Sequence, residues 1–208
     1  MEIQLALDRM SIEKAKDVIS ETEASIDIVE MGTSLLKDFG LNGLDELRKT
    51  YKGPLLVDLK TVDEAEYEFS QVYRHGADIA TAMGVTTPET LEICQQVASQ
   101  FHRSFMIDTI GMSLEKINTL VQYPNAIICV HLSYDSAGSV KDIADDFLTQ
   151  STLSNRLAIS GGISVENIEY LNDKGFDIAV IGSGITGNDS PGNAAKKIRE
   201  LLTDERLS

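Results

Sequence analysis

The feature that most constrains the fold of this chain is a repeat of short apolar runs, each followed by a segment with helical periodicity. Eight runs are predicted to be strands, over residues 3–7, 27–30, 55–60, 78–82, 104–108, 126–131, 157–160 and 177–182. Most contain Ile, Val, Leu or Ala without polar alternation, which is typical of parallel strands covered on both faces. Gly40, Gly76 and Gly175 stand where the intervening helices are expected to end.

A polar residue or a glycine stands at the end of each predicted strand, and these positions recur 22 to 29 residues apart. They are Asp8, Glu30, Asp58, Thr81, Asp108, His131, Ser160 and Gly182. Eight strand–helix units of this length predict an α/β fold, a single (β/α)8 TIM barrel. In such a barrel the carboxyl ends of the strands lie on one face, where the loops form the active site. Side chains far apart in the sequence are therefore expected to meet there.

Composition and charge restrict the class of protein and its partners. The 208 residues are 42% hydrophobic and 25% charged, enough to bury a full core, and the repeat fills residues 1–208 without room for a second domain. A net charge of −15 argues against nucleic acid or an anionic membrane as a partner. We see no secretion signal and no apolar run long enough for a membrane span. Cys94 and Cys129 fit buried thiols in a reducing compartment, so a cytoplasmic location is expected.

Residues 182–187 read G-S-G-I-T-G, the spacing of dinucleotide-binding loops. A dinucleotide fold needs a further strand with an acidic residue about 20 positions on, whereas the residues after Gly187 read as one helix. NAD is therefore not expected. Gly182 and Ser183, with Gly161 and Gly162 after the seventh strand, instead predict a phosphate site, because these two loops commonly bind phosphate in barrels. Tight strand-to-helix turns would explain the same glycines, and this alternative stays open.

The stretch V-D-L-K-T-V-D at residues 57–63 places two carboxylates around a lysine. Asp58 and Lys60 alternate along a strand end and are expected to share one face, and Asp63 follows as a helix begins. Close carboxylates repel each other, and a lysine or a divalent cation relieves the repulsion. The stretch alone fits two interpretations: a chemical site, or an Asp58–Lys60 ion pair beside a helix capped by Asp63.

Glu30, at the end of the neighbouring strand, favours the chemical site. With Asp58 it offers two hard oxygen ligands on adjacent strands, which suit Mg²⁺ with several waters retained. Asp8 and Asp108 end two further strands. Of the three histidines, only His131 falls at a strand end, and its ordinary pKa near neutrality makes it the candidate for proton transfer.

Six motifs occur in order along the chain. They are A-L-D ending at Asp8, D-I-V-E-M-G-T around Glu30, D-x-K-x-x-D from Asp58, M-I-D-T-I-G-M around Asp108, I-S-G-G-I around Gly161 and I-G-S-G-I-T around Gly182. Together they resemble the orotidine 5′-monophosphate decarboxylase suprafamily, from residue 3 to about residue 200. Within it the chain is similar to the group of 3-hexulose-6-phosphate synthases and 3-keto-L-gulonate-6-phosphate decarboxylases, which depend on Mg²⁺.

The resemblance implies a Mg²⁺-dependent aldol condensation of D-ribulose 5-phosphate with formaldehyde through an enediolate. Glu30 and Asp58 would bind Mg²⁺, and Lys60 would act as a cation rather than as a Schiff base. His131 would transfer the proton. The residues that would position substrate hydroxyls or water are Asp8, Asp108 and Asp135. Asp63 would reach into the site of a neighbouring subunit, which implies a homodimer with shared active sites.

Two stretches favour the synthase over the decarboxylase: T-A-M-G-V from Thr81, and the loop after His131, where Tyr134 replaces the arginine of the decarboxylase. Two positions depart from the group, because Ala137 replaces the usual Gln and Ser183 replaces a phosphate-binding Arg found in many members. Three alternatives stay open. They are the decarboxylase, which shares the enediolate; an isomerase like ribulose-phosphate 3-epimerase, which would need more histidine ligands; and a non-catalytic phosphosugar sensor.

Overall fold

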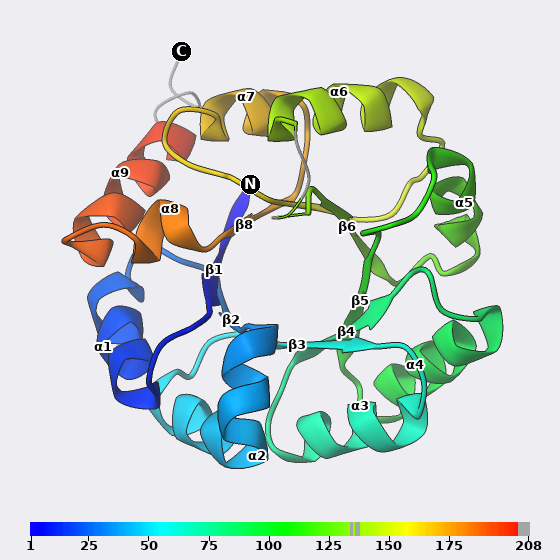
Figure 1. Cartoon of the computed structure of the whole chain (residues 1–208), viewed down its shortest axis with the longest axis horizontal. Coiled ribbons are helices and arrows are strands. Elements are labelled where there is room, and N and C mark those ends of the chain that lie inside the picture. Colours follow the sequence, from blue (N-terminus) through cyan, green and yellow to red (C-terminus); the bar gives the residue numbers. More distant parts are fainter. Residues whose placement is uncertain (134, 136–137, 204–208) are drawn as a thin grey trace.

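The computed structural model describes residues 1–133, 135 and 138–203. Its eight parallel strands form a closed barrel in sequential order, in which β8 pairs with β1 (Figure 1). The strands are β1 (Glu2–Leu7), β2 (Ile28–Met31), β3 (Leu55–Thr61), β4 (Ile79–Met83), β5 (Ser104–Asp108), β6 (Ile127–His131), β7 (Leu157–Ser160) and β8 (Ile178–Ile181). All eight predicted strands are present, each within one residue of its expected bounds. The predicted TIM barrel is confirmed.

A ring of helices covers the outside of the barrel (Figure 1). They are α1 (Ile12–Thr22), α2 (Thr33–Thr50), α3 (Ala65–Arg74), α4 (Pro88–Gln100), α5 (Leu114–Asn118), the 3-10 helix η1 (Thr119–Gln122), α6 (Val140–Gln150), α7 (Ile168–Asp173), α8 (Ser183–Thr186) and α9 (Pro191–Thr203). No helix among the described residues is both long and apolar enough to cross a membrane.

The strands bury side chains on both faces, which explains their continuous apolar sequences. The outward-facing side chains pack against the helices in the larger core. The inward-facing side chains fill the barrel with a second cluster of Ala6, Ile28, Leu56, Ile79, Met106, Ile127, Cys129, Ala158, Ile178 and Val180. Because side chains alternate along a strand, the same inward-facing rows continue upward into Glu30, Asp58, Thr81 and Asp108 at the carboxyl end. The apolar floor of the barrel thus leads directly to the charged strand ends.

Three aspartates tie strands together at the opposite, amino-terminal end of the barrel. Each carboxylate accepts a hydrogen bond from a backbone amide of a neighbouring strand: Asp27 from Ile3 (2.7 Å), Asp78 from Leu55 (3.0 Å) and Asp177 from Leu157 (2.7 Å). Asp78 also accepts from Arg48 and Arg103. Each aspartate precedes a strand and satisfies an amide at the start of the adjoining one. This end of the barrel is built for stability.

The three predicted helix ends are confirmed. Gly76 and Gly175 follow α3 and α7 with φ of 92° and 86°, the left-handed backbone that glycine adopts without a steric penalty. Gly40, with a φ of 57° and a ψ of −154°, is non-helical and separates two helices that meet at a kink within α2. Leu44 and Leu47 of the second helix are fully buried against the barrel.

Candidate active site

The carboxyl ends of the strands surround a cavity of about 30 Å³. It is lined by Gln4, Glu30, Leu56, Asp58, Lys60, Thr81, Met106, Asp108, Cys129, His131, Ser160 and Val180. The barrel thus brings together five of the predicted site residues, Glu30, Asp58, Lys60, Asp108 and His131, from four strands. Charged side chains concentrated at this end of a TIM barrel mark its active-site face.

Lys60 is the centre of the charged cluster. Its ammonium nitrogen lies 2.9 Å from Asp58 Oδ2 and 3.0 Å from Asp108 Oδ2. Burial lowers the pKa of Lys60, but the charges of Asp58 and Asp108 outweigh it and hold the pKa well above its ordinary value. The lysine is therefore a cation, which opposes its use as a nucleophile and agrees with the expectation from the sequence.

The Asp58 carboxylate is held by two hydroxyl groups in addition to the lysine. Thr33, at the start of α2, donates to Oδ2 at 2.5 Å, and Thr81 on β4 donates to Oδ1 at 2.8 Å. Asp58 is itself only 8% exposed. The orientation of this carboxylate is therefore fixed by groups on α2, β3 and β4. Neither threonine was predicted from the sequence to be a site residue.

Glu30 is buried beside Asp58, and both the burial and the neighbouring charge oppose its ionisation. Burial, and then the charge of Asp58, raise the pKa of Glu30 to about 8. Gln4, which lies deeper in the barrel and is 1% exposed, donates to Glu30 Oε2 at 2.6 Å. The other end of this amide, Oε1 of Gln4, has no hydrogen-bond partner among the described residues. Gln4 could not be predicted from the sequence, because a single glutamine in an apolar strand carries no signal of its own.

Asp108 connects the lysine to the histidine. Its Oδ2 accepts from Lys60 and from Nδ1 of His131, which lies at 2.7 Å, and its Oδ1 accepts from the amide of Ile110 at 2.9 Å. Burial raises the pKa of Asp108, but the hydrogen bond and charge of His131 and the charge of Lys60 bring it below its ordinary value. Because the carboxylate is ionised, the histidine donates through Nδ1, and Nε2 is the nitrogen left to exchange a proton.

Asp8 lies at the edge of this cluster. Its Oδ1 accepts from the hydroxyl of Ser34 at 2.7 Å and from the amide of Ser34 at 3.1 Å, at the start of α2. Its charge also contributes to the raised pKa of Glu30. A side chain at Gly32 would overlap the Asp8 carboxylate, since a Cβ there would lie 2.3 Å from Oδ2. This explains why glycine follows Met31 at the end of β2.

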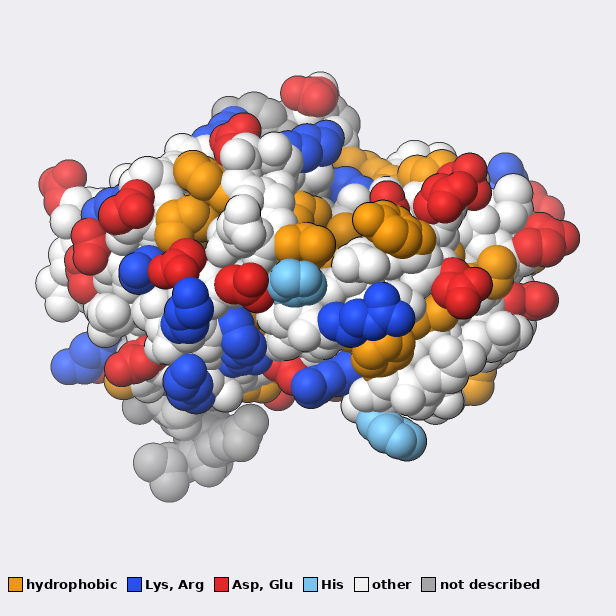
Figure 2. Space-filling view, turned by 90° about the horizontal axis from the view of Figure 1, so that it is seen from below, with side chains coloured by type: hydrophobic (Ala, Val, Ile, Leu, Met, Phe, Trp, Pro, Cys, Tyr) orange, Lys and Arg blue, Asp and Glu red, His pale blue; other side chains and the backbone are white. Residues whose placement is uncertain are grey.

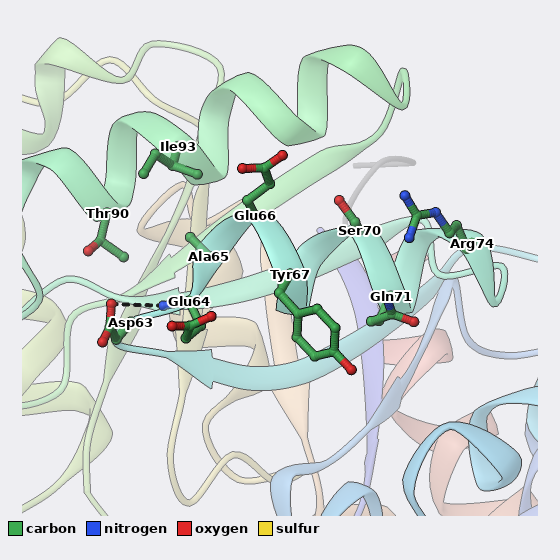
Figure 3. Close-up of a pocket in the computed structure, with 10 residues that line it drawn as sticks. All are labelled: Asp63, Glu64, Ala65, Glu66, Tyr67, Ser70, Gln71, Arg74, Thr90 and Ile93. Atoms are coloured by element: carbon green, nitrogen blue, oxygen red, sulfur yellow. Dashed lines mark hydrogen bonds between the residues drawn. The ribbon is translucent and has the colours of Figure 1, made fainter.

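Asp63 lies apart from the buried cluster. It lines a groove of about 430 Å³ between α3 and α4, together with Tyr67, Arg74 and Ile93 (Figure 3). The larger hollow of the two is thus outside the barrel, whereas the buried acids and the lysine surround the smaller one. Asp63 does not cap α3, because Glu64 occupies the N-cap position and makes no side-chain hydrogen bond there. Among the bonds found for the Asp63 side chain, the carboxylate accepts only the amide of Glu64, at 2.9 Å. The predicted helix cap is wrong, and the predicted Asp58–Lys60 ion pair is confirmed.

The loop after β6 carries the remaining predicted acid, Asp135. It is exposed, and its amide donates to the hydroxyl of Ser133 at 3.3 Å. Tyr134 and Ala137, the two positions that bear on specificity, lie outside the described residues.

The predicted phosphate loops adjoin one another. Gly161 has a φ of 109°, and a Cβ there would lie 2.5 Å from the carbonyl oxygen of Leu132. Gly162 has a φ of 66° and open space where a side chain would be. The turn after β8 packs against the same loop, since a Cβ on Gly184 would lie 2.2 Å from the carbonyl oxygen of Ile163. Close packing therefore accounts for Gly161 and Gly184, whereas Gly162 leaves its backbone open to a ligand.

The strand before the G-x-G-x-x-G stretch is β8, which pairs with β1 and closes the barrel. Gly182 and Ser183 lead from it into α8, a helix of one turn, and then toward α9. The glycines therefore belong to a barrel loop rather than to the doubly wound sheet of dinucleotide-binding folds.

The donor set fits a hard divalent cation. Two carboxylates, Glu30 and Asp58, lie on adjacent strands, and the charge of Asp58 makes deprotonation of Glu30 less favourable. A cation between them would remove that cost. No group of three or more His, Cys, Asp or Glu side chains within the described part of the chain is arranged to hold a metal. Mg²⁺ suits such a site, because it is commonly bound by one or two carboxylates while water and substrate oxygens fill its other coordination positions.

Comparison with known proteins identifies the family of this barrel. The closed barrel with charged strand ends defines the class, a TIM barrel with its site at the carboxyl ends of the strands. The chain belongs to the orotidine 5′-phosphate decarboxylase / HUMPS family, whose model matches residues 1–198. This is a family of phosphosugar lyases.

Among its relatives, the 3-hexulose-6-phosphate synthase of Staphylococcus epidermidis is 32% identical over 97% of this chain and 99% of its own. That of Bacillus subtilis is 31% identical over 97% and 99%. The crystal structure of 3-hexulose-6-phosphate synthase from Salmonella typhimurium superimposes with a TM-score of 0.90 at 27% identity, over 97% of this chain and 98% of that one. The family resemblance inferred from the six motifs is confirmed.

Proposed function

We propose that this protein is a 3-hexulose-6-phosphate synthase, which condenses D-ribulose 5-phosphate with formaldehyde in a Mg²⁺-dependent aldol reaction. The observation that carries the proposal is the buried chain of contacts from Asp58 through Lys60 and Asp108 to His131, beside Glu30, at the mouth of the barrel. The synthases similar to this chain over nearly its whole length support the same activity.

Glu30 and Asp58 would hold Mg²⁺, and the ion would offset negative charge that develops on the substrate oxygens. Lys60 supplies a second positive charge from its fixed position between Asp58 and Asp108. The Lys60 charge is in place before the reaction, so little reorganisation of this group is needed when the substrate carbonyl becomes an oxyanion.

His131 transfers the proton. Its Nδ1 is committed to Asp108, so Nε2 accepts the proton from the substrate carbon beside the carbonyl, and the electron pair left behind forms the enediolate. The enediolate carbon then attacks the carbon of formaldehyde, a carbon–carbon bond forms, and the aldehyde oxygen takes up the proton that His131 accepted. Asp8 and Asp135 would contact substrate hydroxyls or water.

The substrate phosphate would bind at the loops after β7 and β8. Gly162, Gly182 and Ser183 are the candidates, because their backbone is free of bulky side chains at the mouth of the barrel. Ser183 brings no cation, so backbone amides would provide most of the phosphate contacts.

The partner would be a second copy of the chain, docked over the groove of Asp63. Exposed apolar side chains surround this groove: Tyr67 and Ile93 line it, and Val62 precedes Asp63. Figure 2 shows this side of the molecule, where hydrophobic side chains lie among acidic and basic ones. Covering them in a homodimer would bring Asp63 of one subunit to the site of the other.

The test is the consumption of ribulose 5-phosphate by the purified protein with Mg²⁺, with and without formaldehyde, and again with EDTA. We expect the protein to consume ribulose 5-phosphate only when formaldehyde is present. The consumption should stop with EDTA and be abolished in the Asp58→Ala variant. Asp45→Ala is the matched control, because Asp45 is a partly exposed carboxylate paired with His75 on the outside of the barrel. Turnover of 3-keto-L-gulonate 6-phosphate instead would identify the decarboxylase. Ligand binding without turnover of either substrate would identify a sensor.

A further inference from the structure

The end of β3 departs from regular strand geometry at the residues that carry the charged cluster. Val57 is paired with Ala80 of β4, but the next pair joins Thr61 to Ala82. Strand β3 thus advances four residues while β4 advances two. Lys60, within this irregular segment, has a φ of 52°, which is the left-handed region that a lysine rarely adopts.

The irregularity places Lys60 beside Asp58 rather than above it. In a regular strand, side chains two residues apart lie about 6.6 Å apart along the strand axis. Because β3 absorbs two extra residues here, Lys60 does not advance by that distance relative to β4. Its ammonium turns back to reach both Asp58 and Asp108 in the same layer of the barrel. The left-handed backbone is therefore part of what assembles the cluster.

Thr81 lies opposite the irregular segment, between Ala80 and Ala82, and is 3% exposed. Its hydroxyl oxygen accepts the backbone N–H of Lys60 at 2.9 Å and donates its own proton to Asp58 Oδ1 at 2.8 Å. A threonine hydroxyl has one donor and two acceptor positions, so this single group serves both contacts at once. The Lys60 amide would otherwise lack a ladder partner at the point where β3 and β4 fall out of register.

We infer that Thr81 is a positioning residue whose hydroxyl bridges the Lys60 backbone to the Asp58 carboxylate and so fixes both members of the cluster. The inference concerns how the site is built, and its functional meaning rests on the proposed synthase activity. Thr81 acts through Asp58 and Lys60, without contact to the reacting atoms.

Hydrogen exchange of the Lys60 amide tests the bridge without reference to any substrate. In the wild-type protein this amide is expected to exchange slowly, because it is bonded to Thr81. Thr81→Val keeps the β-branched shape and removes the hydroxyl, and it should raise the exchange rate of the Lys60 amide roughly five- to tenfold. Thr81→Ser retains the hydroxyl and should preserve the protection. A Lys60 amide that exchanges freely in the wild-type protein overturns the inference, even if Thr81→Val does not fold.

Metal affinity and steady-state kinetics test the consequence for the site. Mn²⁺ binding followed by electron paramagnetic resonance should weaken about 10- to 100-fold in Thr81→Val, the usual cost of losing a group that orients a metal ligand. The kcat should fall by a similar factor with a smaller change in KM for ribulose 5-phosphate, and Thr81→Ser should restore both. The control is Thr22→Val, since Thr22 is also fully buried but donates only to carbonyls of its own helix.

The outcomes separate this inference from the proposed function. Thr81→Val with wild-type Mn²⁺ affinity and unchanged Lys60 exchange overturns the positioning role. Thr81→Ser as impaired as Thr81→Val also overturns it, because shape rather than the hydroxyl would then matter. If the wild-type protein lacks synthase activity while exchange and Mn²⁺ affinity respond as expected, the proposed function fails and the positioning role stands.

Discussion

Lys60 is held as a cation between two buried carboxylates, and this contact decides which chemistry the lysine performs. A charged ammonium stabilises negative charge on a substrate but does not attack a carbonyl. The same contact explains how three charged groups share a small volume, since each carboxylate has a positive partner within 3.0 Å. Glu30 has no such partner among the contacts found for its side chain, and burial, followed by the charge of Asp58, raises its pKa.

The raised pKa of Glu30 predicts how the metal-free protein responds to pH. The pKa is about 8 in the folded protein against an ordinary value of 4.5, so the folded state keeps this proton while the unfolded state loses it. The contribution of Glu30 to stability is full below pH 4.5 and is lost as the pH rises to about 8. The loss amounts to roughly 1.4 kcal/mol for each unit of pKa difference.

Urea unfolding in EDTA between pH 5 and 8.5 measures this effect. Glu30→Gln should remove the decline seen in the wild-type protein, and Glu92→Gln, an exposed acid on α4, should leave it unchanged. A decline of equal size in Glu30→Gln would show that another group is responsible.

Asp108→Asn tests the link between the lysine and the histidine. The amide cannot carry the negative charge that orients Nδ1 of His131 and pairs with Lys60, so kcat should fall about 100-fold or more, with little change in KM. Steady-state assays with ribulose 5-phosphate and formaldehyde measure both constants. Asp142→Asn, in the exposed first turn of α6, is the control. A wild-type kcat in Asp108→Asn would remove His131 from the proposed mechanism.

The residues that could be predicted from the sequence are those whose type alone is unusual at a strand end. Acids, a lysine and a histidine stand out against apolar strands, and five of them meet in the cavity. Thr33 and Gln4 could not be assigned, because hydroxyls and amides occur widely and only the fold reveals their partners. Asp63 shows the opposite case: its spacing from Asp58 is distinctive in the sequence, yet the fold directs it into the outer groove.

The strands carry most of the information about the fold, and their ends carry the site. Continuous apolar sequence predicted all eight strands, because strands buried on both faces have no polar alternation. The left-handed backbone of Lys60 and the register shift of β3 were beyond prediction, since neither glycine nor proline marks them. Gly40 was predicted to end a helix, and the structure has a kink between two helices at this glycine.

The amino-terminal ends of the strands are expected to contribute stability without contributing to catalysis. Asp78→Ala removes the acceptor of Arg48, Arg103 and the Leu55 amide, so the free energy of unfolding should fall by about 1–3 kcal/mol. Urea denaturation measures the loss, and Mn²⁺ affinity should stay at the wild-type value because the site lies at the other end of the barrel. Asp45→Ala should cost less. Loss of Mn²⁺ affinity in folded Asp78→Ala would contradict this division between the two ends.

At the scale of the whole molecule, the closed barrel leaves no sheet edge for association in the described part of the chain, so a partner is expected to dock on helices or loops. Tyr67 is 64% exposed beside Asp63 on α3, and it is the test position for a dimer over this groove. Tyr67→Glu should convert the dimer to monomer in sedimentation velocity and lower the activity with it. Val121→Glu, at a 50% exposed position on η1, should leave the dimer intact. A monomeric wild-type protein would refute the shared active site.

If the proposed function is right, the cluster of Glu30, Asp58, Lys60, Asp108 and His131 removes a proton beside the carbonyl of a phosphoketose. Proton NMR of ribulose 5-phosphate in D₂O, with the Mg²⁺-loaded protein and without formaldehyde, measures this step alone. We expect the C1 proton signal to be lost as solvent deuterium replaces the proton, and the exchange to stop with EDTA or in Asp108→Asn. A folded, metal-loaded protein that leaves the C1 protons in place would refute this role of the cluster.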